Sequence, residues 1–272
     1  MIHEASRANG SHSNGQSVSR PSAPPTTSAV ERIRRIAADR VSIQLSAFSW
    51  YRYEVVDPLL VAGPVRFLNI GTGGGVETLR LLRKGNHVTT IEIDPDTAAR
   101  TRERVERNGF GDRHVGHVGH VLDVPVTGLF DGVLMCEVLE HIKDDFKALQ
   151  RVSQWLAPGG RLILTTPTAS WGQVLGDEVT VVEDGGHVRV GYDGPELDAM
   201  FADIGLITLK RFTMGHRLVC WHQRLERVLY STRVTRPVGR GVSFLSRPLM
   251  PLLDAVPGRP LCQVTLAVKR HA

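Results

Sequence analysis

The sequence has few cysteines and no long hydrophobic run. Its 272 residues include three cysteines, Cys136, Cys220 and Cys262, which are far apart and form no CxxC pair. An odd, scattered set excludes a disulfide framework and is typical of a reducing compartment. No apolar stretch reaches the roughly 18 residues that a membrane span needs, and none near the first residue has the pattern of a signal peptide. We therefore expect a cytoplasmic protein.

Large apolar side chains are almost missing from residues 1–28, which are rich in Ser, Asn, Gly and Pro. This composition buries too little surface to offset the entropy lost on ordering, and it predicts a disordered tail. Residues 29–60 have helical periodicity and predict an N-terminal helical lid. The lid ends in the aromatic residues Trp50, Tyr51 and Tyr53, for which core or lid packing and stacking on a substrate are both open.

Apolar strands alternate with helical segments from residue 61 onward. We predict strands at 65–70, 87–93, 115–121, 130–136, 161–166, 206–212 and 263–270. Asp94-Pro95 and Gly194-Pro195 each open a helix, because Pro suits the first helical turn, and residues 157–160 (APGG) are expected to form a turn. The alternation predicts an α/β fold with a mainly parallel seven-stranded sheet and helices on both faces. Its core spans 61–213, and 261–272 supplies the final strand.

A glycine-rich turn follows the first predicted strand. Such a turn between a strand and a helix lets the backbone approach a ligand closely. Glu92 ends the second strand, 21 residues after Gly71, where an acid accepts hydrogen bonds from ribose hydroxyls. A tight turn without a ligand is one alternative. A dinucleotide site is another, but Val76 stands where its fingerprint needs a small residue, which disfavours NAD.

Five segments, in order, resemble motifs of the S-adenosyl-L-methionine (SAM)-dependent methyltransferase family: NIGTGGG (69–75), IEIDP (91–95), LDVP (122–125), FDGVLMCEVLEHI (130–142) and LAPGGRLILTTP (156–167). The resemblance implies a class I enzyme with a Rossmann-like fold and SAM as its cofactor. It implies cofactor contacts from Asn69, Gly71, Thr72, Gly73, Gly75, Glu92, Ile93, Asp123, Val124 and Glu137. Asn69 stands where the family usually has an acid, which keeps open a catalytically silent SAM-binding protein.

Three candidate catalytic residues, Glu137, Glu140 and His141, follow the fourth strand, at the edge where α/β sheets bind ligands. We expect His141 with Glu137 to act on the substrate, His141 as the base, because its pKa lies near neutrality. Helix capping by Glu140 and His141 is the alternative. With His187, these residues also resemble a divalent-metal pattern of ubiquinone-pathway O-methyltransferases and small-RNA 2′-O-methyltransferases. We predict no metal requirement, because EVLEHI also occurs in relatives that bind none.

Histidines also recur in the stretch 114–120. On a strand, His114 and His120 share one face while His117 points to the other. The spacing therefore favours a solvated strand entrance over a zinc site.

Residues 214–260 carry eight arginines against two acids, a net charge of +6, whereas the whole chain carries +5. We expect this insertion between the last two strands to be helical, to fold over the carboxyl edge of the sheet and to select the acceptor. Interleaved arginines and apolar residues favour an anionic or amphiphilic substrate, or peripheral membrane contact. The alternative is a solvated cap in which the aliphatic parts of the arginine side chains cover a hydrophobic core.

The sequence thus predicts methyl transfer to a small molecule, such as a natural product of secondary metabolism, a glycolipid or a sugar-like metabolite. RNA methylation is the alternative suggested by the basic charge. No RNA-binding motif is present, so we expect no nucleic-acid partner.

Overall fold

The computed structural model describes residues 46–175, 179–180, 182–183 and 185–271. All of them belong to the second of two compact units, which spans residues 43–272. The predicted tail over 1–28 and the first part of the predicted lid lie outside the described residues.

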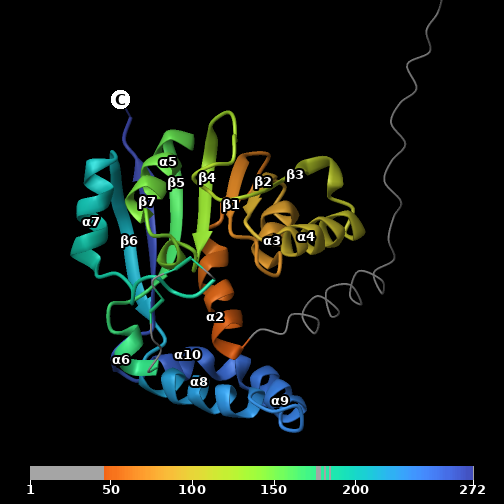
Figure 1. Ribbon diagram of the computed structural model, residues 1–272, viewed down its shortest axis with the longest axis vertical. Helices are drawn as coiled ribbons and strands as arrows, with labels where there is room; N and C mark the ends of the chain where they lie inside the picture. The colour runs from red at the N-terminus through yellow and green to blue at the C-terminus, as the bar shows by residue number, and fades with distance from the viewer. Residues whose placement is uncertain (1–45, 176–178, 181, 184, 272) are drawn as a thin grey trace, which may run out of the picture. The chain divides into compact units, whose positions relative to one another are not determined.

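The described residues form one seven-stranded sheet with the order β3-β2-β1-β4-β5-β7-β6 (Figure 1). Its strands are β1 (Arg66–Ile70), β2 (His87–Glu92), β3 (His114–Val118), β4 (Phe130–Cys136), β5 (Leu156–Pro167), β6 (Leu206–Met214) and β7 (Cys262–Lys269). Strands β1 to β5 pair in parallel, whereas β7 is antiparallel to both β5 and β6. Strand β6 therefore runs in the direction of the first five. The predicted mainly parallel, Rossmann-like sheet is confirmed.

Helices cover both faces of the sheet (Figure 1). Those of the core are α2 (Ala47–Val56), η1 (Asp57–Leu59), α3 (Val76–Arg83), α4 (Pro95–Arg107), η2 (Gly111–Arg113), η3 (Leu139–His141), α5 (Asp145–Trp155), α6 (Trp171–Leu175) and α7 (Gly194–Asp203). Two predicted helix starts are confirmed with their local cause. The Asp94 side chain accepts from the backbone N–H groups of Asp96 and Thr97, and Asp193 accepts from that of Glu196. Each cap satisfies donors that have no partner inside the helix.

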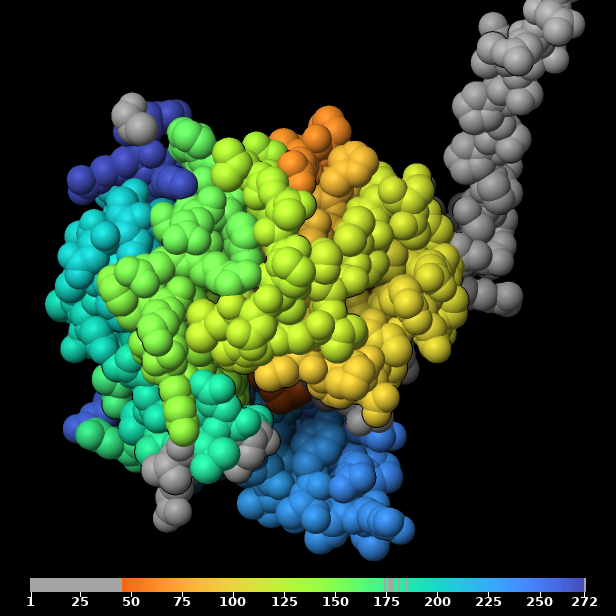
Figure 2. Space-filling model, turned by 45° about the horizontal axis from the view of Figure 1, so that its top comes forward, coloured from red at the N-terminus to blue at the C-terminus, as the bar shows by residue number. Residues whose placement is uncertain are grey.

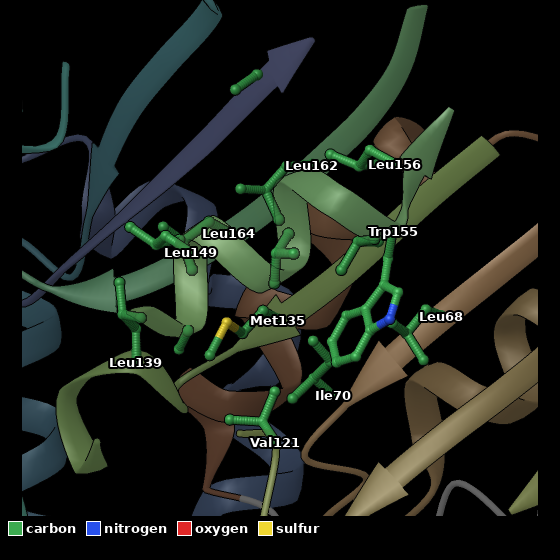
Figure 3. Packing of buried hydrophobic residues seen from close by; sticks show 14 of the residues in the cluster. Leu68, Ile70, Val121, Met135, Leu139, Leu149, Trp155, Leu156, Leu162 and Leu164 are labelled. Atoms are coloured by element: carbon green, nitrogen blue, oxygen red, sulfur yellow. The ribbon is translucent and has the colours of Figure 1, made fainter. Parts of the chain in front are cut away.

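The pleat of the strands divides the core into two clusters. On one face, alternate residues such as Leu68, Met135 and Leu162 pack with α5 and α7 (Figure 3). On the other face, their neighbours Phe67 and Leu134 pack with α2, α3 and α8. Successive side chains of a strand point to opposite faces, so a sheet covered on both sides needs nearly continuous apolar strands. This is why the strand segments were readable from the sequence.

Two predicted boundaries were wrong. The APGG segment does not separate a helix from a strand, because β5 already begins at Leu156 and pairs with Phe130 before its register shifts to Arg161 opposite Gly132. The four residues form an irregularity within the strand, with Gly159 at φ +75°. The third strand lies at 114–118 instead of 115–121, because Gly119 leaves the strand at φ +144°.

The insertion between β6 and β7 is helical, as predicted. It comprises α8 (Arg217–Tyr230), α9 (Arg236–Ser246), η4 (Arg247–Leu249) and α10 (Met250–Asp254). It lies beyond the carboxyl ends of β4 and β6, and the space-filling view shows it in blue below the rest of the described unit (Figures 1 and 2). Among the described residues, no helix is both long enough and apolar enough to cross a membrane.

The inner side of the insertion is part of the protein core. Val219, Cys220 and Met250 belong to the same buried cluster as Ala47 and Val56 of α2. Helix α2 contacts α8, α9, η4 and α10. Excising the insertion would therefore expose core residues, so its role as a cap must be tested by changes on its outer surface.

Candidate functional site

The loop after β1 is shaped by glycines with positive φ. Gly71, Gly73 and Gly75 have φ values of +73°, +47° and +72°, which side chains with a Cβ rarely adopt. A Cβ at Gly71 would also collide with the side chain of Val138, which follows β4. Nothing lies within 4 Å of the place a Cβ would take at Gly73. The loop therefore lies against the β4 end of the sheet while its backbone at Gly73 stays open to a ligand.

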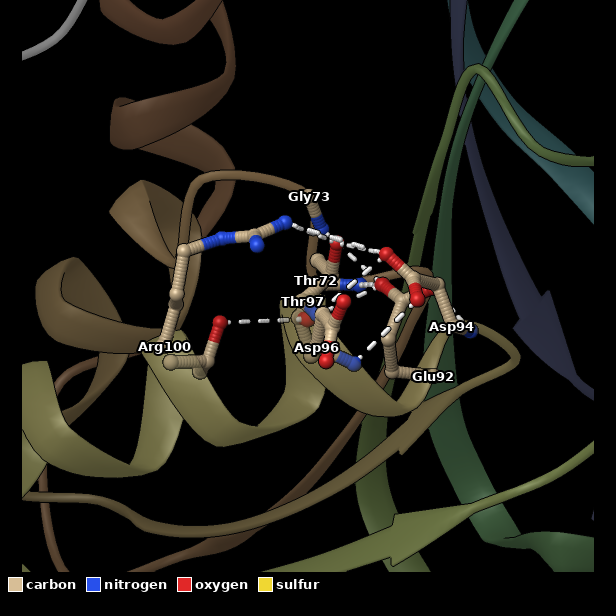
Figure 4. Close-up of polar contacts among 8 residues, drawn as sticks. Thr72, Gly73, Glu92, Asp94, Asp96, Thr97 and Arg100 are labelled. Atoms are coloured by element: carbon tan, nitrogen blue, oxygen red, sulfur yellow. Dashed lines mark hydrogen bonds and ion pairs between the residues drawn. The ribbon is translucent and has the colours of Figure 1, made fainter.

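Glu92 ties this loop to the end of β2 (Figure 4). Its Oε2 accepts from the Thr72 backbone N–H at 2.8 Å, the Thr72 hydroxyl at 2.9 Å and the Gly73 N–H at 3.1 Å. In contrast, its Oε1 accepts from one group, the Asp94 backbone N–H at 3.2 Å, in the described residues. A carboxylate oxygen has two acceptor positions, so Oε1 is the atom suited to a ribose hydroxyl. Oε2 therefore shapes the loop, and the ribose contact of Glu92 stays a prediction for Oε1.

The remaining predicted cofactor residues are spread along the same edge. Asn69 is buried, and its Nδ2 donates to the Thr78 hydroxyl at 2.9 Å, which ties β1 to α3. Asn69 is therefore the donor in this contact, whereas a carboxylate at the same position would have no proton to donate. Ile93 is 61% exposed, and Val124 is buried. Asp123 is exposed. Their contacts with a cofactor stay predictions.

Glu137 is the one non-glycine residue with positive φ in the described part of the chain, at +52°. Its backbone N–H donates to the Thr165 carbonyl at 3.0 Å, and its Oε1 accepts from the Thr165 hydroxyl at 2.9 Å. The Cys262 thiol, on β7, lies 3.4 Å from the same oxygen. A left-handed conformation at a residue with a Cβ costs energy and persists only where its surroundings hold it. Contacts from β5 and β7 hold Glu137 at the end of β4.

Arg52 of α2 is a site residue that sequence reasoning missed. Its Nη1 lies 3.5 Å from Glu137 Oε2, and its side chain is 12% exposed. Its Nε is buried without a hydrogen-bond partner among the described residues. Burial alone would lower the pKa of Arg52, but the charges of Glu137, Tyr53 and the nearby cysteines together outweigh it and the pKa is raised. A permanent positive charge thus faces the site, and nothing in the local sequence around Arg52 signals it.

The segment after β4 and the link after β5 together form a cluster of Glu140, His141 and His187. One potential ligand atom from each of the three lies within 4.8 Å of the others. The cluster includes three of the four residues of the sequence-derived metal pattern and leaves out Glu137. The link is held back on the sheet edge by the Val188 N–H, which donates to the Glu140 carbonyl at 2.9 Å.

Glu140 is fully buried, and both of its carboxyl oxygens lack hydrogen-bond partners in the described residues. Burial raises the pKa of Glu140 well above its ordinary range, and the charge of Glu137 raises it further. The alternative in which Glu140 caps a helix through its side chain is excluded by these unpartnered oxygens. A carboxyl in such surroundings is stable either as the neutral acid or as a ligand of a cation.

His141 has a defined tautomer. Its Nδ1 lies 2.8 Å from the carbonyl oxygen of Gly186, and because a carbonyl only accepts, Nδ1 must carry the proton. Its Nε2 then has a free lone pair and lies 4.0 Å from Glu140 Oε1. His187 packs edge-on against His141 and stacks on Trp171 at a ring separation of 4.2 Å. The imidazole of His141 is thus oriented on two sides.

The histidines of 114–120 and the aromatic residues of α2 lie outside this cluster. In the described residues, the metal-capable group is the one above, and the histidines of 114–120 form none. The Nε2 of His114 instead bonds the Thr90 hydroxyl at 3.0 Å. Tyr53 is buried in the core, while Trp50 faces Arg247, whose guanidinium carbon is 5.9 Å from its ring centre. Burial and the Asp254 charge raise the pKa of Tyr51 to about 12. These aromatic residues pack α2 against its neighbours.

Comparison with known proteins identifies the family. Residues 68–164 match the family model described as a methyltransferase domain. A ubiquinone biosynthesis O-methyltransferase of Xanthomonas axonopodis pv. citri (strain 306) is 30% identical over 176 residues, which are 62% of this chain and 74% of that protein. The chain belongs to the class I SAM-dependent methyltransferases. A second relative of the same description, from Xanthomonas oryzae pv. oryzae (strain PXO99A), is 32% identical over 130 residues, and the chain spans 54% of its length.

The methyltransferase fold is also found in a solved structure of the N-methyltransferase NodS from Bradyrhizobium japonicum WM9 in complex with S-adenosyl-L-homocysteine. It has a TM-score of 0.51 at 16% identity and covers 90% of each chain. The enzyme uses SAM as its cofactor. The residues present fit it, because the open backbone at Gly73 and the available Oε1 of Glu92 lie on neighbouring loops.

Proposed function

We propose that this methyltransferase transfers a methyl group to a hydroxyl of a small-molecule acceptor, with His141 as the general base. The observation that carries the proposal is the tautomer of His141, whose proton is held on Nδ1 and whose Nε2 is free. The side chain is 31% exposed, so an acceptor can reach it. The relatives described as ubiquinone biosynthesis O-methyltransferases support an oxygen acceptor.

The proposed chemistry needs little from the protein beyond position and a base. SAM supplies a methyl group activated on a sulfonium. A hydroxyl is a weak nucleophile until its proton leaves, and Nε2 of His141 takes that proton. The Gly186 carbonyl then stabilises the charged imidazolium, because it accepts from Nδ1. Burial raises the pKa of Glu140, which favours its neutral form and weakens an ion pair with a protonated His141.

The insertion supports an anionic or amphiphilic acceptor, such as a natural product, a glycolipid or a sugar-like metabolite. It lies at the sheet edge where the site residues lie (Figure 1). Seven of its eight arginines are exposed. Positive charge at the entrance raises the local concentration of an anionic acceptor.

A second use of the same cluster is favoured by the unpartnered carboxyl of Glu140. Glu140, His141 and His187 would hold a divalent cation, since carboxylate and imidazole together suit such ions. A cation would lower the pKa of an acceptor hydroxyl and would replace the base. The prediction that no metal is required therefore needs a direct test.

The proposal is tested with purified enzyme and radiolabelled SAM. We expect label to enter the small-molecule fraction of metabolite extracts and not purified RNA, and mass spectrometry then shows a methyl ether. Calorimetry with SAM gives the control, because a protein that binds SAM and labels nothing is the silent alternative. Label in RNA, with binding that weakens steeply as salt rises, would establish the RNA alternative.

A further inference from the structure

The outer side of the insertion exposes large apolar side chains in a regular pattern. On α8, Leu218, Trp221, Leu225 and Val228 recur at a spacing of three to four residues, so they share one face of the helix. They are 37%, 61%, 49% and 67% exposed. The opposite face of α8 is occupied, since Val219 and Cys220 lie in the core. The helix therefore has two apolar sides, of which one is unburied.

Large apolar side chains are also exposed in the rest of the insertion. Exposed apolar residues there are Val234, Val238, Phe244, Leu245, Leu249 and Leu252, and their exposed fractions run from 50% to 86%. Large apolar side chains exposed together on one surface mark an interaction site.

The charges on this surface have one sign. Exposed arginines accompany the apolar residues on α8, in the link to α9 and on α9: Arg217, Arg224, Arg227, Arg233, Arg236 and Arg240. The Arg224 guanidinium lies over the Trp221 ring, 5.5 Å from its centre. Stacking of this kind keeps a cation beside the exposed indole.

The two acids of residues 214–260, a segment that the structure describes throughout, are turned inward. Glu226 is 2% exposed, and its Oε1 accepts from the backbone N–H of Ala47 at 3.0 Å. Asp254 Oδ1 accepts from the backbone N–H groups of Gly215 and His216 at 2.8 and 2.7 Å. Because both carboxylates serve internal contacts, neither of the segment's own acids contributes to its outer face, where six of its arginines are exposed.

We infer that the outer faces of α8, α9 and α10 dock on a membrane surface that contains anionic lipid. Apolar side chains and an indole enter the headgroup region of a bilayer, and arginines beside them meet the lipid phosphates. A second copy of this chain fits poorly, because two such faces repel each other. Nucleic acid would leave the leucines and valines without a partner. Docking through this surface places the carboxyl edge of the sheet, with the methyl-transfer site, toward the bilayer.

The test is co-sedimentation of the purified enzyme with vesicles of phosphatidylcholine alone or of phosphatidylcholine and phosphatidylglycerol in equal parts. We expect binding to the mixed vesicles, little binding to phosphatidylcholine, and release as salt rises. The variant Arg233→Glu/Arg236→Glu/Arg240→Glu should weaken binding about 100-fold, since each arginine adds to the attraction of an anionic surface. Leu225→Ser/Val228→Ser should weaken it as well, because it removes apolar contact.

Matched controls change exposed residues elsewhere. Arg102→Glu/Arg107→Glu/Arg161→Glu reverses the same number of charges outside the insertion, and Leu209→Ser replaces an exposed leucine of β6. Both should bind as the wild type does, and calorimetry with SAM should show that all variants fold. Equal binding to both vesicles, no binding to either, or unaltered binding by the two insertion variants would overturn the inference. The assay contains no acceptor, so its outcome is independent of the proposed reaction.

Discussion

Arg52 and Glu137 form an ion pair that joins helix α2 to the end of the central strand β4, with Nη1 and Oε2 3.5 Å apart. The pair links a residue in left-handed conformation to the helix that packs against the insertion. Through this contact, the position of Glu137 depends on the docking of α2. The catalytic edge and the insertion are therefore parts of one packed structure.

The Arg52–Glu137 pair should contribute measurably to the stability of the fold. In a double-mutant cycle of Arg52→Met and Glu137→Gln, the free energies of unfolding should be non-additive by about 1 kcal/mol, because both side chains are largely buried. Urea denaturation measures each corner of the cycle. The exposed pair Lys147–Asp144 provides the control, and its cycle should give roughly 0.5 kcal/mol or less. Additive effects at Arg52 and Glu137 would show that the pair does not couple α2 to β4.

His141→Gln should lower kcat about 100-fold or more, because proton removal by a positioned base contributes on that order. The KM for SAM should hardly change, since His141 lies in the acceptor part of the proposed site. His87→Gln alters an exposed histidine at the other edge of the sheet and should leave kcat as it is. A His141→Gln enzyme with normal kcat would remove His141 from the mechanism.

Glu92→Ala should weaken SAM binding by about 1–3 kcal/mol, the usual cost of leaving buried hydrogen-bonding groups unpaired. Part of the loss comes from the loop, since the N–H groups of Thr72 and Gly73 lose their acceptor. Thr72→Val keeps those backbone bonds and should have a smaller effect. Unchanged affinity of Glu92→Ala in calorimetry would mean that the ribose is held elsewhere.

Chelation separates the two uses of the Glu140 cluster. We expect methylation to persist in excess EDTA, and the melting temperature to stay constant when magnesium or manganese is added. The melting experiment needs no acceptor and detects binding by stabilisation of the folded state. Loss of activity in EDTA that either ion restores would instead assign Glu140, His141 and His187 as ligands.

Glu77, at the start of α3, predicts a pH dependence of stability. Burial raises its pKa to about 6 from an ordinary 4.5, although Arg52 and Arg80 oppose the shift. Between these values the folded state binds the proton more tightly than the unfolded chain does, so stability falls as pH rises. The loss is complete above the folded pKa and amounts to roughly 2 kcal/mol. Urea denaturation at several pH values should show that Glu77→Gln lessens the fall by about this amount, whereas exposed Glu103→Gln leaves it unchanged.

Local signals account for most of the fold that the sequence predicted. Asp94 and Pro95 define the start of α4 by hydrogen bonding and a preset backbone angle, which need no tertiary information. Apolar strands such as 130–136 were readable because both faces of the sheet are covered. The APGG segment was wrongly predicted to be a turn, because glycine and proline are typical of both turns and strand irregularities.

Only some of the site residues could be predicted from such local signals. The glycine loop, Glu92 and His141 stand at positions that a strand and a turn define. Arg52 could not be found, since its partner comes from a distant strand and its own surroundings read as an ordinary aromatic helix. The burial of Glu140 and the approach of His187 depend on how the link after β5 folds back, which no periodicity encodes.

The position of β7 has a consequence for synthesis on the ribosome. This strand is made after β6 and the entire insertion, yet it lies between β5 and β6 in the sheet. Until it emerges, the inner edge of β5 is an unpaired template, and β6 has no neighbour to pair with. Helices α8 to α10 are therefore synthesised before the place between β5 and β6 is filled. A pause in translation just before residue 262 would lengthen the period in which this chain is prone to aggregate.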